Sequence, residues 1–313
     1  MNKSFAILVL IGLGLAGALV GRVVAADDTW TLDDVVDSAQ EWATNNLDDG
    51  ALRMLEGEGQ ARTRQLLDEI ERRFHGEYVL DLGQLRETAN QVIPLLEAHP
   101  ETKPYVVWIR TRLDYLDAAD ELRLIIPLPK PIPGVAPVPA PNPPAEKERE
   151  VWTKKMADRP WPEAAKPVVA KLKPVFVEEK VPPELVWIAE VESSFDAGAK
   201  SPAGAAGLFQ LMPDTAKRYG LRTWPFDQRY NAEDSGRAAA RCLAALHRKF
   251  QDWRLAVAAY NAGEGTVQNQ LKRRNAKTFD EISPYLPAET QMYVPKVEAT
   301  ILRREGVKLE ELR

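Results

Sequence analysis

Residues 181–195, which read VPPELVWIAEVESSF, predict a short helix with a carboxyl group at the end of its apolar face. Pro183 suits the first position of a helix, and Glu184 in the first turn complements the helix dipole. The residues at spacing i, i+3, i+4 and i+7, which share one face of a helix, are Leu185, Ile188, Ala189 and Glu192. Glu190 falls on the opposite side of this helix. Glu192 therefore occupies a position where an apolar core residue is expected.

A carboxyl group on a buried helix face has chemistry that an exposed carboxyl lacks. Burial disfavours the ionised form, so the pKa of the group rises. A raised pKa allows a general acid to carry its proton near neutral pH. The other interpretation is that Glu192 is simply exposed at the helix end, and this segment alone does not choose between the two.

The chain after Glu192 predicts a polar, glycine-rich loop. Residues 204–213 read GAAGLFQLMP, and glycine permits tight turns and close approach of the backbone to a ligand. Ser201 and Gln210 flank this loop and can hydrogen-bond hydroxyl or amide groups. A loop of this kind directly after a buried carboxyl suits a groove for a neutral polar polymer.

Residues 253–267, WRLAVAAYNAGEGTV, predict a core helix that ends at a glycine turn. The first half of this segment is apolar on nearly all sides, as in a buried helix. Tyr260 closes the helix, and the Asn261-Ala262-Gly263 sequence breaks it. Taken alone, Tyr260 is more simply interpreted as a core residue.

Three sequence blocks together resemble the soluble lytic transglycosylase family, with the membrane-bound enzymes of the D type as nearest kin. The blocks are ESSF followed by AKSPAGAAGLFQLMPDTA, then AAYNAGEGTV, then LPAETQMYVPKV. They occur in the family's order within residues 150–303, about half of the chain, and Phe209 stands where the family often has methionine. The N-terminal region lies outside the resemblance.

This resemblance implies an all-helical, lysozyme-like domain with a long glycan groove and Glu192 as its catalytic acid/base. It implies that Ser201 assists at the N-acetyl group or the C6 hydroxyl of the sugar, and that Tyr260 faces the catalytic carboxyl. The full set of substrate-binding residues implied in this way is Ser201, Gln210, Tyr260, Asn261, Glu289 and Tyr293.

The implied reaction is cleavage of the β-1,4 bond between N-acetylmuramic acid and N-acetylglucosamine, with formation of a 1,6-anhydromuramic end and without a cofactor. Most glycosidases use two carboxylates. Asp196 and Glu264 are the nearest candidates for a second one, but a turn cap and a solvated loop acid are their simpler roles. The alternatives are a hydrolase like goose-type lysozyme and a non-catalytic glycan-binding protein. Peptidoglycan glycan strands are the expected partner.

The predicted domain organisation has four parts. Residues 1–26 resemble a secretory signal peptide, and an apolar run of 16 residues would span about 24 Å as a helix, short of the roughly 30 Å of a bilayer core. An uncleaved membrane anchor is the alternative. Residues 27–126 predict a helical accessory domain that could bind cell-wall proteins, 127–146 a proline-rich linker, and 147–313 the catalytic domain.

Composition restricts the remaining function classes. The chain of 313 residues has a formal net charge of -5, and without residues 1–26, which contain two basic and no acidic residues, the charge is -7. An acidic chain is a poor candidate for nucleic-acid binding.

The single cysteine, Cys242, excludes an internal disulfide, and a buried apolar role is expected for it. The histidines His75, His99 and His247 lack ligand spacing, which argues against a metal site. Together with the signal-like residues 1–26 and the family resemblance, these features predict an exported enzyme of the periplasm or cell envelope.

Overall fold

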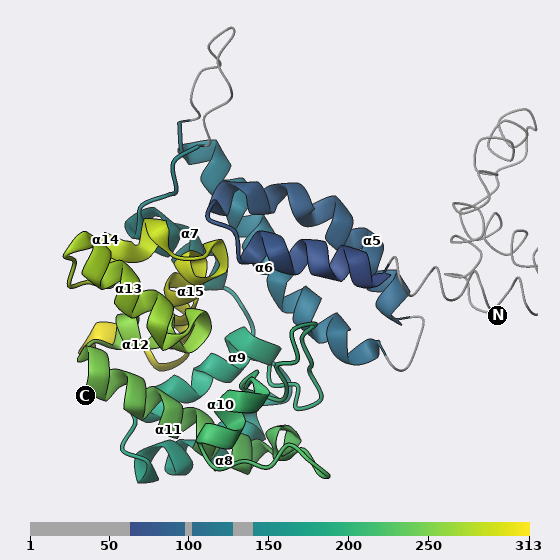
Figure 1. Cartoon of the computed structure of the whole chain (residues 1–313), viewed down its shortest axis with the longest axis vertical. Coiled ribbons are helices and arrows are strands. Elements are labelled where there is room, and N and C mark those ends of the chain that lie inside the picture. Colours follow the sequence, from purple (N-terminus) through teal and green to yellow (C-terminus); the bar gives the residue numbers. More distant parts are fainter. Residues whose placement is uncertain (1–62, 98–101, 128–139) are drawn as a thin grey trace, which may run out of the picture. The chain divides into compact units, whose positions relative to one another are not determined.

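The computed structural model describes residues 63–97, 102–127 and 140–313 (Figure 1). These residues form helices joined by loops and no strand, so the predicted all-helical class is confirmed for them. Two isolated antiparallel bridges, 200 with 206 and 206 with 211, close the glycine-rich loop. The predicted signal peptide and most of the predicted linker lie outside the described residues.

The described elements are α-helices of different lengths and a few short 3₁₀ turns. A first helix covers residues 63–74. After it the chain forms η1 (Val79–Leu85), α5 (Arg86–Glu97), α6 (Lys103–Ile125), α7 (Ala145–Met156), α8 (Ala165–Glu178), η2 (Pro183–Trp187), α9 (Ile188–Ser193), α10 (Pro213–Arg218), η3 (Gln228–Tyr230), α11 (Ala232–Phe250), α12 (Trp253–Ala262), α13 (Glu264–Arg274), α14 (Phe279–Ile282), η4 (Ser283–Tyr285), α15 (Ala288–Glu305) and η5 (Leu309–Glu311).

Backbone contacts divide the chain into two compact units, of which one contains residues 70–89 and 104–313. The predicted boundary at residue 126 does not coincide with this division. The reason is visible in α6, whose residues 104–125 bury Ile109, Tyr115 and Leu122 and bond to α15 and to residue 159. Whether residues 27–126 fold as a domain of their own stays a prediction.

Several helices begin at side chains that satisfy their first backbone amides. Asn231 accepts hydrogen bonds from the amides of Glu233 and Asp234, both at 3.0 Å, at the start of α11. Asp252 accepts from the amide of Leu255 at 2.9 Å at the start of α12. Caps of this kind contribute about 1 kcal/mol each to helix stability. They fix where the helices that carry the site begin.

The core of the larger unit gathers around α8, α9, α11 and α12. Phe176, Trp187, Phe209 and Leu243 are 0% exposed and belong to one cluster of buried apolar side chains. Cys242 is buried in the same cluster, as predicted. Because interiors are packed at crystal-like density, this cluster holds the short helix α9 rigidly.

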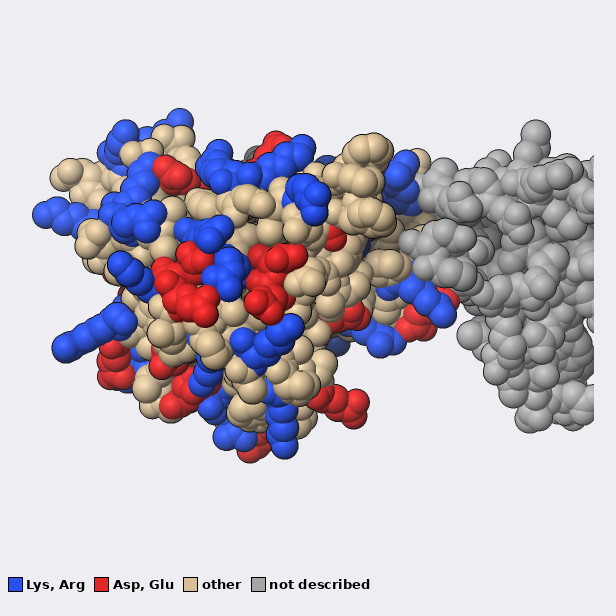
Figure 2. Space-filling view, turned by 90° about the horizontal axis from the view of Figure 1, so that it is seen from below, with Lys and Arg blue, Asp and Glu red and all other residues tan. Residues whose placement is uncertain are grey.

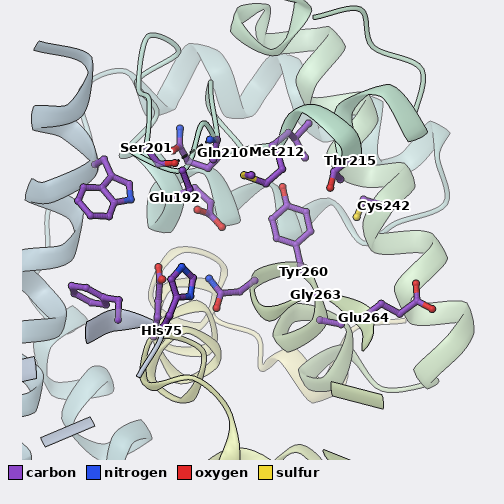
Figure 3. A pocket seen from close by; sticks show the side chains of 18 of the residues that line it. His75, Glu192, Ser201, Gln210, Met212, Thr215, Cys242, Tyr260, Gly263 and Glu264 are labelled. Carbon is purple, nitrogen blue, oxygen red and sulfur yellow. Dashed lines mark hydrogen bonds between the residues drawn. The ribbon is translucent and has the colours of Figure 1, made fainter. Parts of the chain in front are cut away.

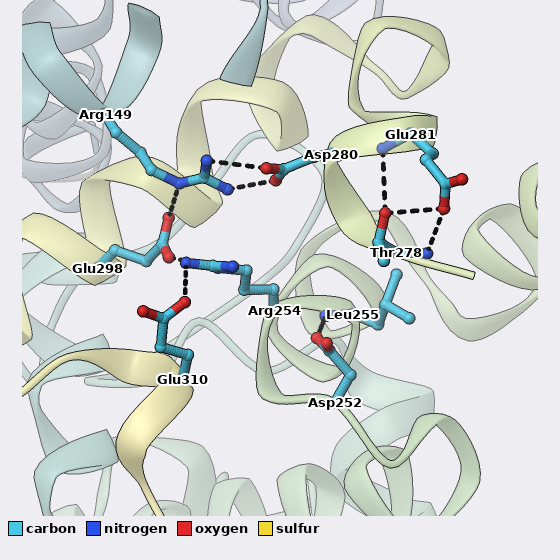
Figure 4. A network of polar contacts seen from close by, with 9 residues as sticks. All are labelled: Arg149, Asp252, Arg254, Leu255, Thr278, Asp280, Glu281, Glu298 and Glu310. Carbon is cyan, nitrogen blue, oxygen red and sulfur yellow. Dashed lines mark hydrogen bonds and ion pairs between the residues drawn. The ribbon is translucent and has the colours of Figure 1, made fainter. Parts of the chain in front are cut away.

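An ionic network joins helices that are distant in sequence (Figure 4). Glu298 of α15 accepts from Arg149 of α7 at 2.8 Å and from Arg254 of α12 at 2.6 Å. Arg149 also pairs with Asp280, and Arg254 donates to Glu310 at 2.7 Å. This network fixes one face of α15.

The surface of the described residues mixes both signs of charge. On the face shown in Figure 2, basic and acidic side chains lie interspersed. No helix among the described residues has the length and apolar character that crossing a membrane requires.

Candidate active site

Helix α9 carries Glu192 in its last turn and is buried over its whole length. Leu185, Ile188 and Ala189 of the predicted apolar stripe are 0% exposed, as expected. Glu190, which was expected on the opposite side, is buried as well, and Leu185 belongs to the 3₁₀ turn η2 that precedes α9, so this segment is buried on all sides. Glu192 itself is 5% exposed, so the alternative of an exposed helix end is excluded. The helix ends at Ser194 in the left-handed conformation, with φ of 52°, and the chain turns directly after the carboxyl.

The carboxyl group of Glu192 is bonded to a tyrosine and lies near two charged side chains. The hydroxyl of Tyr293 donates to Oε1 of Glu192 at 2.6 Å. Burial raises the pKa of Glu192 from 4.5 to about 7, the charge of Arg112 and the Tyr293 hydrogen bond oppose the rise, and Glu289 adds to it. Both protonation states of Glu192 are therefore accessible near neutral pH, as a group that acts first as acid and then as base requires.

A buried ion pair lies close to this carboxyl. Nη2 of Arg112 on α6 donates to Oε1 of Glu289 on α15 at 2.7 Å, and the two side chains are 9% and 10% exposed. Removing one partner of such a pair leaves an uncompensated buried charge. The pair therefore ties α6 to α15 beside the candidate acid.

The glycine-rich loop is fixed by close packing and by one arginine. Gly207 has φ of 78°, and a Cβ there would lie 1.9 Å from the carbonyl oxygen of Arg229. No side chain fits at that distance, so the position requires glycine. Nη1 of Arg229 donates to the carbonyls of Gly204 at 2.7 Å and Leu211 at 2.8 Å. The loop therefore presents its side chains in one conformation.

Ser201 and Gln210 both belong to this fixed loop. Oγ of Ser201 accepts from the amide of Ala205 at 3.0 Å. Nε2 of Gln210 donates to the carbonyls of Ala199 at 3.1 Å and Gly207 at 2.9 Å. Oε1 of Gln210 is buried and accepts no hydrogen bond from the described residues. Gln210 therefore presents an acceptor for an N–H or O–H group of a ligand.

Tyr260 and Asn261 come from the end of α12. The hydroxyl of Tyr260 donates to the carbonyl of Phe209 at 2.7 Å, which ties α12 to the glycine-rich loop. Burial raises the pKa of Tyr260 well above 10, so its hydroxyl stays protonated. Oδ1 of Asn261 accepts from Oγ1 of Thr290 at 2.6 Å. Each residue is thus held in place by a bond to a neighbouring element.

These side chains line one groove, with a cavity volume of about 250 Å³. In Figure 3 the carboxyl of Glu192 points into the groove, with Ser201, Gln210 and Tyr260 around it. The predicted site residues that line the groove are Glu192, Ser201, Gln210, Tyr260, Asn261 and Glu289. The structure thus brings together residues from α9, α12, α15 and the loop between α9 and α10.

Tyr293 is the exception among the predicted site residues. We expected it to line the groove, but it is 1% exposed and is not among the lining residues. Its side chain instead packs behind Glu192 and donates a hydrogen bond to it. Position 293 comes about one helical turn after position 289 on α15, so the two side chains share a face but reach different depths.

The two other acids considered from the sequence have structural partners. Oδ1 of Asp196 accepts from the amide of Gly198 at 2.7 Å, as in a turn cap. Glu264 lines the far part of the groove and pairs with Lys249. Glu71 also lines the groove. Neither Asp196 nor Glu264 faces the groove as an unpaired carboxylate.

Two of the three histidines lie within the described residues. His75 lines the groove, whereas His247 stacks on Trp253 with ring centroids 3.9 Å apart. His99 lies outside the described residues. Within the described part of the chain, no group of three or more His, Cys, Asp or Glu residues could hold a metal ion.

Residues 177–283 match the family model of the transglycosylase SLT domain. The chain carries an SLT domain. The Glu192-Ser193 pair, the glycine-rich loop and the Tyr260-Asn261 pair all fall within it. The family resemblance drawn from the three sequence blocks is therefore confirmed.

Similar proteins match this chain over part of their own length. The membrane-bound lytic murein transglycosylase D of Escherichia coli K12 is 43% identical over 141 residues, which cover 42% of this chain and 31% of that protein. The soluble lytic murein transglycosylase of Escherichia coli K12 is 34% identical over 120 residues, which cover 35% of this chain and 18% of that protein. A solved complex of the 70-kDa soluble lytic transglycosylase with bulgecin A aligns with a TM-score of 0.40 and 18% identity, covering 98% of this chain and 62% of that one. The chain thus matches less than a third of the length of these two curated relatives.

Part of the groove wall lies outside the SLT domain. The lining includes Phe74, His75, Trp108 and Arg112, which precede residue 177 by at least 65 positions. Figure 3 shows His75 across the groove from Glu192. The sequence contains no spacing that links these residues to Glu192. Trp108 is 4% exposed, so most of its ring is covered.

Proposed function

We propose that this chain is an exported lytic transglycosylase that cleaves peptidoglycan between N-acetylmuramic acid and N-acetylglucosamine and leaves a 1,6-anhydromuramic end. The observation that carries the proposal is Glu192, a buried carboxyl with a pKa of about 7 that points into a groove. The SLT domain and the relatives named as murein transglycosylases support the same substrate.

In the first step Glu192 acts as the general acid. Because Tyr293 donates to Oε1, that oxygen is an acceptor, and the transferable proton is carried by Oε2. Glu192 protonates the glycosidic oxygen, the bond to C1 of N-acetylmuramic acid breaks, and the N-acetylglucosamine part departs. The acetamido oxygen of the substrate stabilises the positive charge that develops on the sugar.

In the second step Glu192 acts as the base. The carboxylate left by the first step takes the proton from the C6 hydroxyl of the same muramic residue. The C6 oxygen then bonds to C1 and closes the 1,6-anhydro ring, so no water is consumed. An intramolecular nucleophile of this kind has a high effective concentration and competes with water when the site excludes solvent.

The neighbouring residues have supporting roles in this proposal. The fixed loop holds Ser201 for the N-acetyl group or the C6 hydroxyl, and Oε1 of Gln210 accepts from a sugar N–H or O–H. Tyr260, Asn261 and Glu289 line the groove where adjacent sugar units would lie. Tyr293 orients Glu192.

A muramidase that uses water is the second candidate. An inverting hydrolase needs a base to activate water, and a retaining one usually needs a carboxylate nucleophile. Besides Glu192, the carboxyls that line the groove are Glu71, Glu264 and Glu289. Glu289 is paired with Arg112 and Glu264 with Lys249, and Glu71 is not without a partner. These pairs favour the single-carboxyl reaction.

Mass spectrometry of the products from purified peptidoglycan tests the choice. Transglycosylation predicts muropeptides lighter by one water than the products of lysozyme on the same material. They should resist borohydride, because a 1,6-anhydro ring has no reducing end. Products that are mainly borohydride-reducible would make the enzyme a muramidase, and Glu192→Gln supplies the background digest.

A further inference from the structure

One arginine outside the SLT domain reaches the surroundings of Glu192. Arg112 of α6 lines the same groove as Glu192 and is 7% exposed. Its Nη2 donates to Glu289 at 2.7 Å and its Nη1 to Oγ1 of Thr111 at 3.0 Å, while its guanidinium lies 5.2 Å from the ring centre of Trp108. The guanidinium is therefore fixed from three sides.

A second ionic contact fixes α6 against α15. Nζ of Lys296, seven residues after Glu289 on the same helix, donates to the carbonyl of Thr111 at 3.0 Å and lies 3.3 Å from Asp114. Asp114 also accepts two hydrogen bonds from Arg159, at 2.6 and 2.7 Å. These contacts set the register of α6 on α15, and this register places Arg112 beside Glu289.

We propose that Arg112 is a positioning residue for the proposed reaction: it neutralises Glu289 beside Glu192 and so sets the electric potential at the acid. This inference rests on the proposed function. It assigns a role at the reacting carboxyl to a helix that precedes the SLT domain.

The reaction requires such a counter-charge for a physical reason. Glu192 must hold a proton in the first step and exist as a carboxylate in the second. A second buried carboxylate without a partner would disfavour the ionised form of Glu192, because like charges in one site raise each other's pKa. Arg112 cancels the charge of Glu289 and favours the ionised form of Glu192 directly. Both effects keep the two protonation states close in energy.

Other groups also face Glu192. Among the described residues they are Arg112 and Tyr115 of α6, Tyr260 of α12, Glu289, Tyr293 and Lys296 of α15, and His75 on the opposite wall. The three tyrosines are neutral near pH 7, since burial raises the pKa of each well above 10. Lys296 stays unchanged in every variant of the test.

The test is a double-mutant cycle with Arg112→Met, Glu289→Gln and the variant that carries both changes. The measured quantity is the pH dependence of kcat/KM on peptidoglycan. In the wild type, kcat/KM should fall at alkaline pH as Glu192 loses its proton, and we call this fall the alkaline limb. Arg112→Met removes a positive charge and leaves Glu289 unpaired, so the alkaline limb should move up by about one pH unit or more. Glu289→Gln leaves the positive charge uncompensated, so the limb should move down. The double variant should return to within about half a unit of the wild type. Arg112→Lys keeps the charge and should hold the limb near its wild-type position.

A matched control separates this effect from loss of any ion pair to α15. Arg149→Met removes contacts to Glu298 of α15 and to Asp280, away from the groove. It should lower the melting temperature and leave the pH limb in place. If Arg112→Met does not fold, the downward shift of Glu289→Gln and the unshifted limb of Arg112→Lys still decide the matter.

The role of Arg112 would be overturned if Arg112→Met and Glu289→Gln both left the alkaline limb unchanged. It would also be overturned if both moved the limb in the same direction. The proposed function fails separately, because it is read from the wild-type products alone. Suppose that the wild type makes anhydro products but the variants do not shift the alkaline limb. The proposed function would then stand, and the positioning role of Arg112 would be rejected.

Discussion

Two glutamates of the same short helix, Glu190 and Glu192, have opposite surroundings. Both are 5% exposed. Glu190 accepts from two of the three guanidinium nitrogens of Arg304, from Nε at 2.9 Å and from Nη2 at 2.7 Å. Glu192 is bonded to the neutral hydroxyl of Tyr293, and its free side faces the groove. Burial alone therefore does not make a general acid.

The difference lies in the group that compensates the buried charge. A bidentate guanidinium satisfies Glu190 as a carboxylate and fixes its structure. Glu192 has weaker compensation, so burial raises its pKa to about 7. One glutamate is thus suited to hold the fold together, and the other to exchange a proton.

Glu192→Gln should have the largest effect on turnover. Glutamine keeps the size of the side chain and its bond to Tyr293 but has no proton to transfer. We expect a loss in kcat of about 10²–10⁴-fold or more, with peptidoglycan binding retained, because general acid–base catalysis contributes on this scale. Release of soluble muropeptides and a sedimentation binding assay measure the two quantities. Turnover close to wild type would reject Glu192 as the acid.

Glu190→Gln should have its main effect on stability. Replacing one partner of a buried pair leaves the charge of Arg304 uncompensated, which costs about 3 kcal/mol of the free energy of unfolding. Urea denaturation measures this cost, and kcat of the folded variant should stay within about tenfold of the wild type, since no proton-transfer group is lost.

The matched variant Glu192→Gln should be at least as stable as the wild type at pH 8. The pKa of Glu192 is higher in the folded protein than in the unfolded chain, so its protonated form stabilises the folded protein. This stabilisation is complete below pH 4.5 and is lost as the pH rises through about 7. Glutamine does not titrate, so the stability of the variant relative to the wild type should increase over this range. A Glu190→Gln variant that loses turnover but not stability would contradict the comparison.

Tyr293→Phe should have the smallest effect. It removes one hydrogen bond that favours the carboxylate, so the pKa of Glu192 should rise and the alkaline limb of kcat/KM should move up by about one pH unit or less. We expect kcat to fall about tenfold, because the carboxyl loses its orienting partner. Tyr260→Phe, which removes a bond to the loop and none to Glu192, is the control for the limb. An unshifted limb in Tyr293→Phe would show that the hydrogen bond does not act on Glu192.

Local periodicity in the sequence predicted several elements well. The apolar positions before Glu192 are buried, and the core helix expected in residues 253–267 is present as α12, which ends at Ala262 just before Gly263. Helix α8 contains Pro174 and still continues to Glu178. Val175 and Phe176 bury their side chains in the core, and this burial outweighs the one backbone bond that proline removes.

Contacts between residues distant along the chain could not be predicted from the sequence. The pairing of Glu190 with Arg304 joins positions 114 apart, and that of Arg112 with Glu289 joins positions 177 apart. No periodicity links such residues, so Arg112 and His75 were not predicted as part of the groove. The different depths of Glu289 and Tyr293 also depend on packing that spacing does not specify. The composition shift at the proline-rich stretch suggested a domain boundary, whereas buried contacts of α6 place residues 104–125 with the larger unit.

The most direct test of the central claim is the pKa of Glu192 in the folded protein. Side-chain carboxyl signals of protein labelled with ¹³C-glutamate can be followed by NMR from pH 4 to 9, with Glu192→Gln and Glu190→Gln used to assign the two signals. We predict that the Glu192 signal titrates with a pKa of about 7. A Glu192 signal that titrates near 4.5, the ordinary value for glutamate, would contradict its role as the proton donor.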